Sequence, residues 1–155
     1  MKKKLSYFIL FLLLNFGALA LGSFLMGGSP MENIWYQNLP KAPWTPPGYV
    51  FGLAWSSIMI CFSLFMARLM TTNNWKLYLQ IYVLQWLLNV TWNPFFFQFH
   101  LLVAALIVIT SLLLVLIWMG LACHKRNTSS WNLLLLPYIL WLFVAISLNA
   151  YPVFQ

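Results

Sequence analysis

Long apolar runs, separated by short polar stretches, make up most of this 155-residue chain. A helix needs about 20 apolar residues to cross the hydrocarbon core of a bilayer. Five runs reach that length, and the connections between them are short except for the first, residues 27–48. The pattern predicts an all-α membrane protein, a bundle of five transmembrane helices that forms a single domain over residues 1–155. The predicted helices are Leu5–Met26, Tyr49–Met70, Trp75–Phe97, Leu101–Cys123 and Trp131–Tyr151.

The first run also imitates a secretory signal peptide, with Lys2–Lys4 before an apolar segment and a small-residue site at Ala18-Leu19-Ala20. The apolar character continues beyond that site to Met26, which gives the segment the length of a full span. We therefore expect the first helix to be retained rather than cleaved.

The chain has a net charge of +7, and its basic residues are distributed unevenly between the two sides of the predicted bundle. All but one of the eight basic residues lie before the first helix, beside the second connection or in the fourth, on one side of a five-helix serpentine. Only Lys41 lies on the other side. Basic residues prefer the cytoplasmic side, so we expect a cytoplasmic N-terminus, an external C-terminus and contact with lipid rather than nucleic acid. The residues on the basic side are Lys2, Lys3, Lys4, Arg68, Lys76, Lys125 and Arg126.

Residues for acid/base and metal chemistry are scarce. The chain has no Asp, and its one Glu, Glu32, lies in a predicted connection, so no triad of nucleophile, base and carboxylate can be assembled. His100 and His124 fall at opposite ends of predicted helices and cannot share a metal. Cys61 and Cys123 fall within helices, where we expect small core residues. The sequence predicts no metal site and no required cofactor, and leaves 9 Trp, 7 Tyr and 13 Phe as the main chemical resource.

Two predicted helices carry polar groups along one face. Gln85, Asn89 and Asn93 follow one another at i, i+4 and i+8, with Trp92 and Phe96 on the same side. At membrane depth such groups face the bundle interior. They indicate either interhelical hydrogen bonds, worth about 0.6–2 kcal/mol each, or the polar wall of a ligand cavity.

The fifth predicted helix repeats this arrangement with Trp141, Ala145 and Asn149 at i, i+4 and i+8. A ring, a small residue and a polar group on one face suit a pocket, although ordinary helix packing explains the pattern equally well. Trp55 and Met59 add a similar pair in the second helix.

Prolines and aromatic residues give the remaining expectations. Pro94 and Pro137 interrupt predicted helices, where we expect kinks. The first connection is rich in both residue types, which favours a packed lid over a flexible linker. Rings near the predicted cytoplasmic side are expected to anchor the bundle in the membrane interface. These are Trp75, Tyr78, Trp118 and Trp131.

Three stretches share a distinctive mixture of Trp, Pro and Asn. The first holds Trp35-Tyr36, Leu39-Pro40-Lys41-Ala42-Pro43-Trp44-Thr45-Pro46-Pro47, Val50-Phe51 and Trp55; the second holds Asn89-x-x-Trp92 and Phe95-Phe96; the third is Pro137-Tyr138-x-x-Trp141-x-x-x-Ala145-x-x-Leu148-Asn149. Together they resemble the signatures of the TspO/MBR family of tryptophan-rich sensory proteins, also called translocator proteins or peripheral benzodiazepine receptors.

The resemblance implies a multi-pass protein of a bacterial inner membrane, commonly a homodimer, with a cavity that opens toward the first connection. It implies a receptor or sensor for porphyrins such as protoporphyrin IX and haem, and for similar flat aromatic ligands, which stacking rings would suit. The binding residues that it implies are Trp35, Tyr36, Pro46, Trp55, Asn89, Trp92, Trp141 and Ala145.

Two alternative functions stay open. Some family members are reported to promote light-dependent porphyrin breakdown, which would make Trp55 and Trp141 catalytic. A porphyrin transporter is the other alternative. Neither an internal repeat nor an ionisable residue at mid-membrane supports it, so the sequence favours the receptor.

Overall fold

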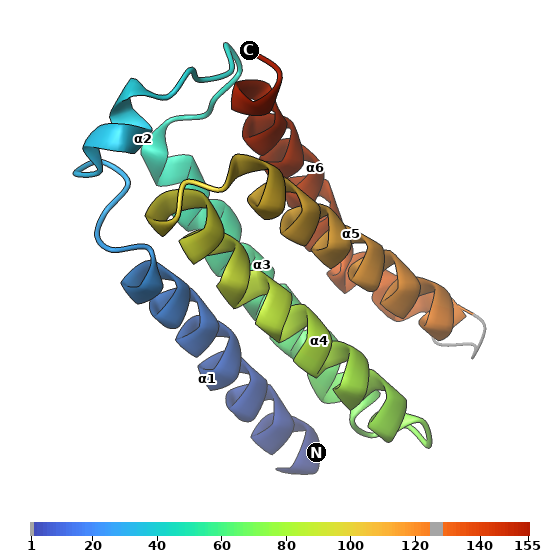
Figure 1. Cartoon of the computed structure of the whole chain (residues 1–155). Helices are drawn as coiled ribbons and strands as arrows, with labels where there is room; N and C mark the ends of the chain where they lie inside the picture. Colours follow the sequence, from blue (N-terminus) through green and yellow to red (C-terminus); the bar gives the residue numbers. More distant parts are fainter. Residues whose placement is uncertain (1, 125–128) are drawn as a thin grey trace.

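The structure is a computed structural model that describes residues 2–124 and 129–155, and those residues contain helices and no strand (Figure 1). The all-α prediction is confirmed. A sixth helix, α2, lies within the first connection and was not expected. The helices are α1 (Lys2–Leu25), α2 (Ile34–Asn38), α3 (Gly48–Leu69), α4 (Trp75–Asn93), α5 (Leu102–His124) and α6 (Leu136–Ala150), with short turns η1 (Pro94–Gln98), η2 (Ser129–Leu134) and η3 (Tyr151–Val153).

Four helical segments are long and apolar enough to cross a membrane: α1, α3, α5, and α6 together with η3. Helix α4 has 19 residues but is less apolar than these four. The polar stripe that includes Gln85, Asn89 and Asn93 lowers its mean hydropathy. The same residues that make α4 informative for function therefore weaken its signal as a membrane span.

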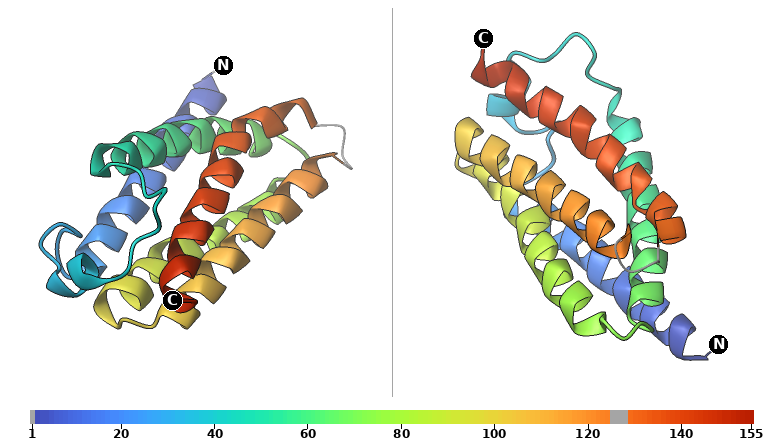
Figure 2. Two further views of the ribbon diagram at one scale, coloured as in Figure 1. Left: turned by 90° about the horizontal axis from the view of Figure 1, so that it is seen from above. Right: turned by 90° about the vertical axis from the view of Figure 1, so that its right-hand side faces the viewer.

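The long helices pack in a closed ring in the order α1, α3, α6, α5, α4, and α4 returns to α1 (Figure 2). Residues 27–48, called the lid from here on, lie with η1 and the C-terminus at one end of this ring, and the N-terminus lies at the other. We call these the lid end and the N-terminal end. The cavity described below lies between the helices toward the lid end.

The two prolines expected to kink helices lie at helix ends instead. Helix α4 ends at Asn93, and Pro94 opens η1, a π-helical turn closed by the bond from Phe99 N to Pro94 O (2.9 Å). Pro137 is the second residue of α6. Proline has no N–H to donate and fits the first turn of a helix, where that N–H has no partner. Neither proline therefore breaks an interior hydrogen bond.

A buried hydrogen-bonded group joins three helices. Asn15 of α1 donates from Nδ2 to Ser63 Oγ of α3 (2.9 Å) and accepts at Oδ1 from the Tyr82 hydroxyl of α4 (2.9 Å). Ser63 in turn donates to Met59 O (2.6 Å). All three polar side chains are almost fully buried. Each buried polar atom of Asn15 therefore has a partner, as an apolar environment requires.

Helix α1 also approaches α4 closely at Gly22. A Cβ atom at this position would lie 2.7 Å from Asn93 Nδ2, so a larger residue would force the Asn93 side chain to shift. Glycine thus lets the two helices meet near the lid end, as small residues do at helix contacts in membranes.

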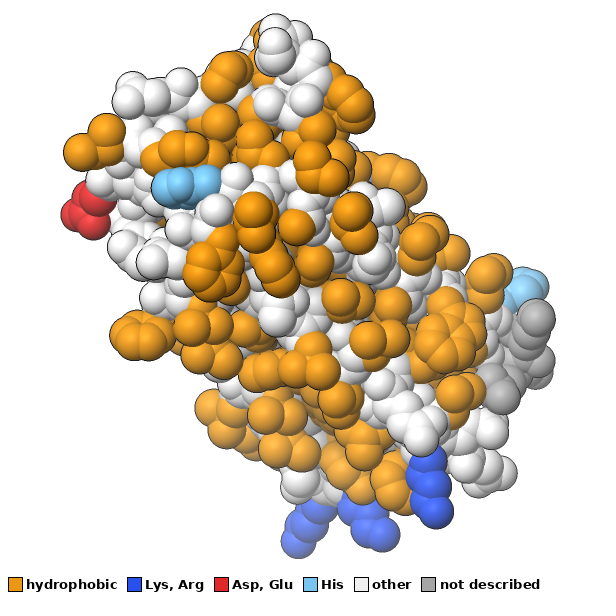
Figure 3. All heavy atoms as spheres, in the orientation of Figure 1, with side chains coloured by type: hydrophobic (Ala, Val, Ile, Leu, Met, Phe, Trp, Pro, Cys, Tyr) orange, Lys and Arg blue, Asp and Glu red, His pale blue; other side chains and the backbone are white. Residues whose placement is uncertain are grey.

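The charged residues separate toward the two ends. On the face shown in Figure 3, Lys and Arg lie at the N-terminal end and the acidic side chain lies near the lid end. Lys125 and Arg126, which the sequence analysis placed with this basic group, lie outside the described residues.

Among the expected interfacial anchors, Trp75 and Trp118 are exposed, but Tyr78 is 1% exposed and belongs to the core. Tyr78 faces inward because it shares a helix face with Tyr82, one turn further along.

We expect Asn15→Leu to lower the free energy of unfolding by about 1–2 kcal/mol, since it removes two interhelical hydrogen bonds. Titration with SDS in mixed micelles, followed by circular dichroism, measures this change. Ser111→Ala is the matched control, because Ser111 Oγ donates within its own helix to Ile107 O (2.8 Å). Equal midpoints for the two variants would contradict the structural role of Asn15.

Candidate ligand-binding site

A cavity of about 540 Å³ lies between the helices at the lid end and the lid itself. This volume is within the usual range for small-molecule sites. Its wall is mainly apolar and aromatic, and it takes residues from α1, the lid, α3, α4, η1 and α6. Prominent lining residues are Leu19, Ser23, Met26, Tyr36, Lys41, Pro46, Phe51, Trp55, Asn89, Trp92, Asn93, Phe96, Phe97, Trp141, Ala145 and Asn149.

The structure brings together all of the predicted binding residues except one. Those that line the cavity are Tyr36, Pro46, Trp55, Asn89, Trp92, Trp141 and Ala145. Trp35 is not in the lining. Trp35 thus lies outside the cavity wall, and the binding role of all eight residues stays a prediction.

The polar stripe on α4 serves both of the purposes that the sequence left open. Gln85 is buried and accepts a hydrogen bond at Oε1 from the Tyr138 hydroxyl of α6 (3.4 Å). One and two turns further on, Asn89 and Asn93 line the cavity. Interhelical bonding thus applies to the first residue and the polar wall to the other two. Trp92 also faces the cavity, between the two asparagines.

Aromatic rings from α3 and α6 form the opposite side of the cavity. Phe51 meets Trp141 edge to face, with ring centroids 5.4 Å apart. Trp55 meets the core residue Tyr138 in the same way at 5.9 Å. Such contacts hold each ring in one orientation. Ala145 lies one turn from Trp141 on the cavity face of α6 and leaves the space that a larger side chain would fill.

The lid is attached to η1 by a short, capped helix. Asn33 caps α2, accepting at Oδ1 from Tyr36 N (3.0 Å), and its Nδ2 donates to Phe97 O (3.2 Å). The Tyr36 ring rests against Phe96 and Phe97, with centroids 6.2 and 5.2 Å away. Burial raises the pKa of the Tyr36 phenol above its ordinary value of 10.0, so the hydroxyl stays protonated at neutral pH.

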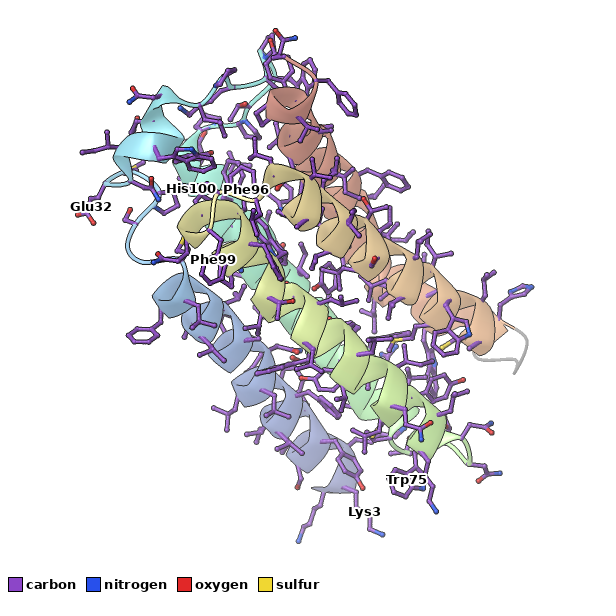
Figure 4. All side chains as sticks on the ribbon, viewed as in Figure 1. Lys3, Glu32, Trp75, Phe96, Phe99 and His100 are labelled. Atoms are coloured by element: carbon purple, nitrogen blue, oxygen red, sulfur yellow. The ribbon has the colours of Figure 1, made fainter. Side chains whose placement is uncertain are left out.

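Trp35 attaches the lid from outside the cavity. Its ring stacks on His100, with centroids 4.0 Å apart and planes 16° apart, and meets Phe96 edge to face at 5.7 Å. Figure 4 shows Phe96 and His100 close to α2. His100 has a φ of 57°, a left-handed conformation that is uncommon for residues with a side chain. This turn between η1 and α5 carries the imidazole to the lid.

A second attachment joins the far part of the lid to α6. Trp44 Nε1 donates to Ser147 Oγ (3.1 Å), and its ring meets Tyr151 edge to face at 5.7 Å. The lid is therefore held at both α2 and Trp44, and the cavity lies beneath it.

Four buried polar atoms on the cavity-lining residues have no partner among the described residues. Two are acceptors, Asn89 Oδ1 and Asn149 Oδ1, and two are donors, Trp92 Nε1 and Trp141 Nε1. The Asn149 amide is oriented by its bond from Nδ2 to Ala145 O (2.8 Å), which leaves Oδ1 free. An unpaired buried polar group costs about 1–3 kcal/mol. Each of these atoms is itself almost completely covered, so a bound molecule or water reaches it only after neighbouring side chains move.

The cavity lining offers rings and hydrogen bonds but little acid/base chemistry. It contains no carboxylate, histidine or cysteine side chain, and its one charged residue is Lys41. Within residues 2–124 and 129–155, no three His, Cys, Asp or Glu side chains come together as a metal site would require. The arrangement is suited to holding a flat, largely apolar molecule.

Sequence reasoning missed part of the wall. Leu19, Ser23 and Met26 come from the first predicted helix, which had suggested only small-residue packing. Their spacing of i, i+4 and i+7 on one helix face was the available signal. Phe51 lies one turn before Trp55 and has the same signal, whereas nothing in the sequence indicated that Lys41 would reach the cavity.

The fold and the cavity define a helical membrane protein with an aromatic cavity at one end. Comparison with known proteins identifies the family: the TspO/MBR family matches residues 8–154, and the chain belongs to it. The tryptophan-rich protein TspO of Bacillus cereus is 33% identical over 148 residues, or 90% of this chain and 88% of that protein. Protein CrtK of Rhodobacter capsulatus is 33% identical over 123 residues, 74% of each chain. The tryptophan-rich sensory protein of Cereibacter sphaeroides is 33% identical over 115 residues, 74% of this chain and 72% of that one. The family resemblance found in the sequence is confirmed.

We expect Trp35→Ala to loosen the lid without altering the cavity wall, because Trp35 holds the lid through His100 and Phe96. An aromatic contact contributes about 0.5–1.5 kcal/mol, so amide hydrogen exchange in α2 should accelerate about two- to tenfold. Exchange measured by mass spectrometry tests this, with α4 as an internal reference. Trp75→Ala, an exposed ring at the N-terminal end, is the control. Unchanged exchange in α2 would show that the stacking does not hold the lid.

Proposed function

We propose that this protein is an integral membrane receptor or sensor that binds a porphyrin, such as protoporphyrin IX or haem, in the cavity beneath the lid. The observation that carries the proposal is the set of unpaired polar atoms in an aromatic wall. An empty apolar cavity would need no such groups, and a polar enzyme site would need more. A flat conjugated ligand with polar substituents matches both features.

The rings and the polar atoms have separate tasks in this proposal. Trp55, Trp92 and Trp141 supply faces and edges for contact with a conjugated macrocycle. The Trp92 and Trp141 N–H groups can donate to acceptors of the ligand, and Asn89 Oδ1 can accept from its donors. Ala145 provides room for the ring system. Binding then relieves the cost of leaving those atoms unpaired.

The comparisons add support for a sensing role. The relative from Cereibacter sphaeroides is named a tryptophan-rich sensory protein, and three tryptophans, Trp55, Trp92 and Trp141, line the cavity described here. A sensor needs to bind and release its ligand without consuming it. A lining with no carboxylate, histidine or cysteine is consistent with binding rather than hydrolysis.

The proposal includes a membrane topology. All five long helices cross a bacterial inner membrane, with α4 shielding its polar stripe inside the ring. The basic N-terminal end lies in the cytoplasm, and the lid and C-terminus lie outside, in keeping with the preference of basic residues for the cytoplasmic side. The cavity would then open toward the periplasmic side.

Reporter fusions at the C-terminus test this topology. We expect alkaline phosphatase fused after Gln155 to be active and a green fluorescent protein fused there to be dark, because each reporter is compartment-specific. The same pair at the N-terminal end of the chain should give a fluorescent green fluorescent protein, which serves as the control. A fluorescent C-terminal fusion would overturn the orientation.

Titration with protoporphyrin IX tests the binding function. We expect saturable quenching of indole fluorescence, and about tenfold weaker binding in Trp141→Ala, which removes a ring and a free N–H donor. Trp55→Ala should weaken binding through loss of ring contact alone. Trp118→Ala, an exposed ring outside the cavity lining, should leave the affinity unchanged.

A second variant blocks the cavity without removing any ring. Ala145→Phe should abolish saturable binding, because the new ring occupies the space beside Trp141, whereas Ala20→Phe on an exposed face of α1 should not. Circular dichroism establishes that each variant is folded, and work in the dark prevents light-driven loss of the porphyrin. Equal affinities in the wild type, Trp141→Ala and Ala145→Phe would refute binding in this cavity.

A further inference from the structure

Lys41 holds an unusual position in the charge pattern of the chain. It is the one basic residue of the lid, and it lines the cavity. Basic residues are disfavoured on the external side of a membrane protein. A lysine kept on the lid, at a cavity, therefore calls for a local explanation.

The surroundings of the Lys41 ammonium group do not neutralise its charge. Its Nζ donates to Tyr36 O (3.0 Å) and Gln37 O (2.9 Å) and lies 5.0 Å from the centroid of the Tyr36 ring. These partners carry no net charge. An ammonium group has three protons to donate, so one remains available. The cavity lining also contains no carboxylate.

The two carbonyl groups hold the ammonium in place. Tyr36 and Gln37 lie in the last turn of α2, where carbonyl groups lack the usual helical partner; the Tyr36 carbonyl also accepts from the capping Leu39 N–H (3.3 Å). Because Lys41 bonds to both, its long side chain is restrained beside the cavity instead of moving freely in solvent. A restrained charge loses less side-chain entropy when it pairs with a ligand.

Building on the porphyrin-binding function above, we propose that Lys41 is a specificity-determining residue that pairs with a carboxylate of the ligand. The rings hold the flat, apolar body of the molecule, and the ammonium group binds an acidic substituent at the lid. The cavity therefore selects planar aromatic acids over neutral molecules of the same shape. A carboxylate is ionised at neutral pH and accepts a charge-assisted hydrogen bond from lysine.

A purely structural role for Lys41, as a cap for α2, makes a different prediction. Loss of the cap would loosen the lid over any ligand, so the affinities for acidic and neutral ligands would fall equally. Loss of a carboxylate partner weakens only the acidic ligand. A pair of ligands that differ only in their carboxylates separates the two roles.

The test uses protoporphyrin IX and its dimethyl ester, with the full chain in phosphatidylcholine nanodiscs so that anionic lipid does not compete. Lys41→Met removes the charge and keeps the length of the side chain. We expect it to weaken binding of the diacid about three- to fivefold and binding of the ester less than twofold. Higher salt should reduce the preference of the wild type for the diacid. Lys76→Met, at the other end of the bundle, is the matched control and should change neither affinity.

The outcomes are distinct. If Lys41→Met lowers the affinity for both ligands by the same factor, or for neither, the carboxylate pairing is wrong although the cavity binds porphyrins. If the wild type binds neither ligand saturably, the proposed function itself fails. A diacid-specific loss confined to Lys41→Met supports the assignment.

Discussion

The hydrogen-bonded group of Asn15, Ser63 and Tyr82 is the interaction on which the arrangement of the cavity depends. Lipid is as apolar as the helices, so hydrophobicity alone gives them no preferred rotation against one another. Ser63 and Tyr82 must each face Asn15, and this sets the rotation of the three helices. Residues nearer the lid on the same faces then line the cavity, one and two turns from Asn15 on α1, and two and three turns from Ser63 on α3 and from Tyr82 on α4. These are Leu19 and Ser23 on α1, Trp55 and Phe51 on α3, and Asn89 and Asn93 on α4.

Polar groups change their role over a short distance along the same helix faces. At Asn15 and Gln85 the buried polar atoms are paired across helices, and the bundle is closed. One turn of α4 beyond Gln85, about 5.4 Å along the axis, Asn89 Oδ1 has no partner. An unpaired polar atom costs free energy in an apolar environment, so Asn89 Oδ1 would gain from a partner in the cavity beside it. The paired structural core therefore ends between Gln85 and Asn89, where the cavity begins.

Hydropathy and helical spacing predicted the long helices and most of the cavity wall, because both depend on local order along the chain. Helix α2 was missed, since its five residues are too few to show a period. Trp35 was predicted to share the cavity with Tyr36, but it points about 100° away around the helix axis, and its ring stacks on His100 outside the lining. The attachment of Trp35 to His100 depends on a turn 65 residues away, which no local pattern reveals.

The lid and the bundle contribute to one cavity from opposite sides, and this has an energetic consequence. Tyr36 and Lys41 belong to the lid, whereas Trp55 and Trp141 belong to the helices beneath it. A molecule that contacts both sets binds more tightly when the lid is closed, and therefore stabilises the closed lid by the same difference in affinity. The lid is held by a few ring contacts and hydrogen bonds rather than by a large apolar core. A modest binding energy therefore suffices to change the population of the closed lid. A cavity with little acid/base chemistry can in this way still convert occupancy into a change at the protein surface.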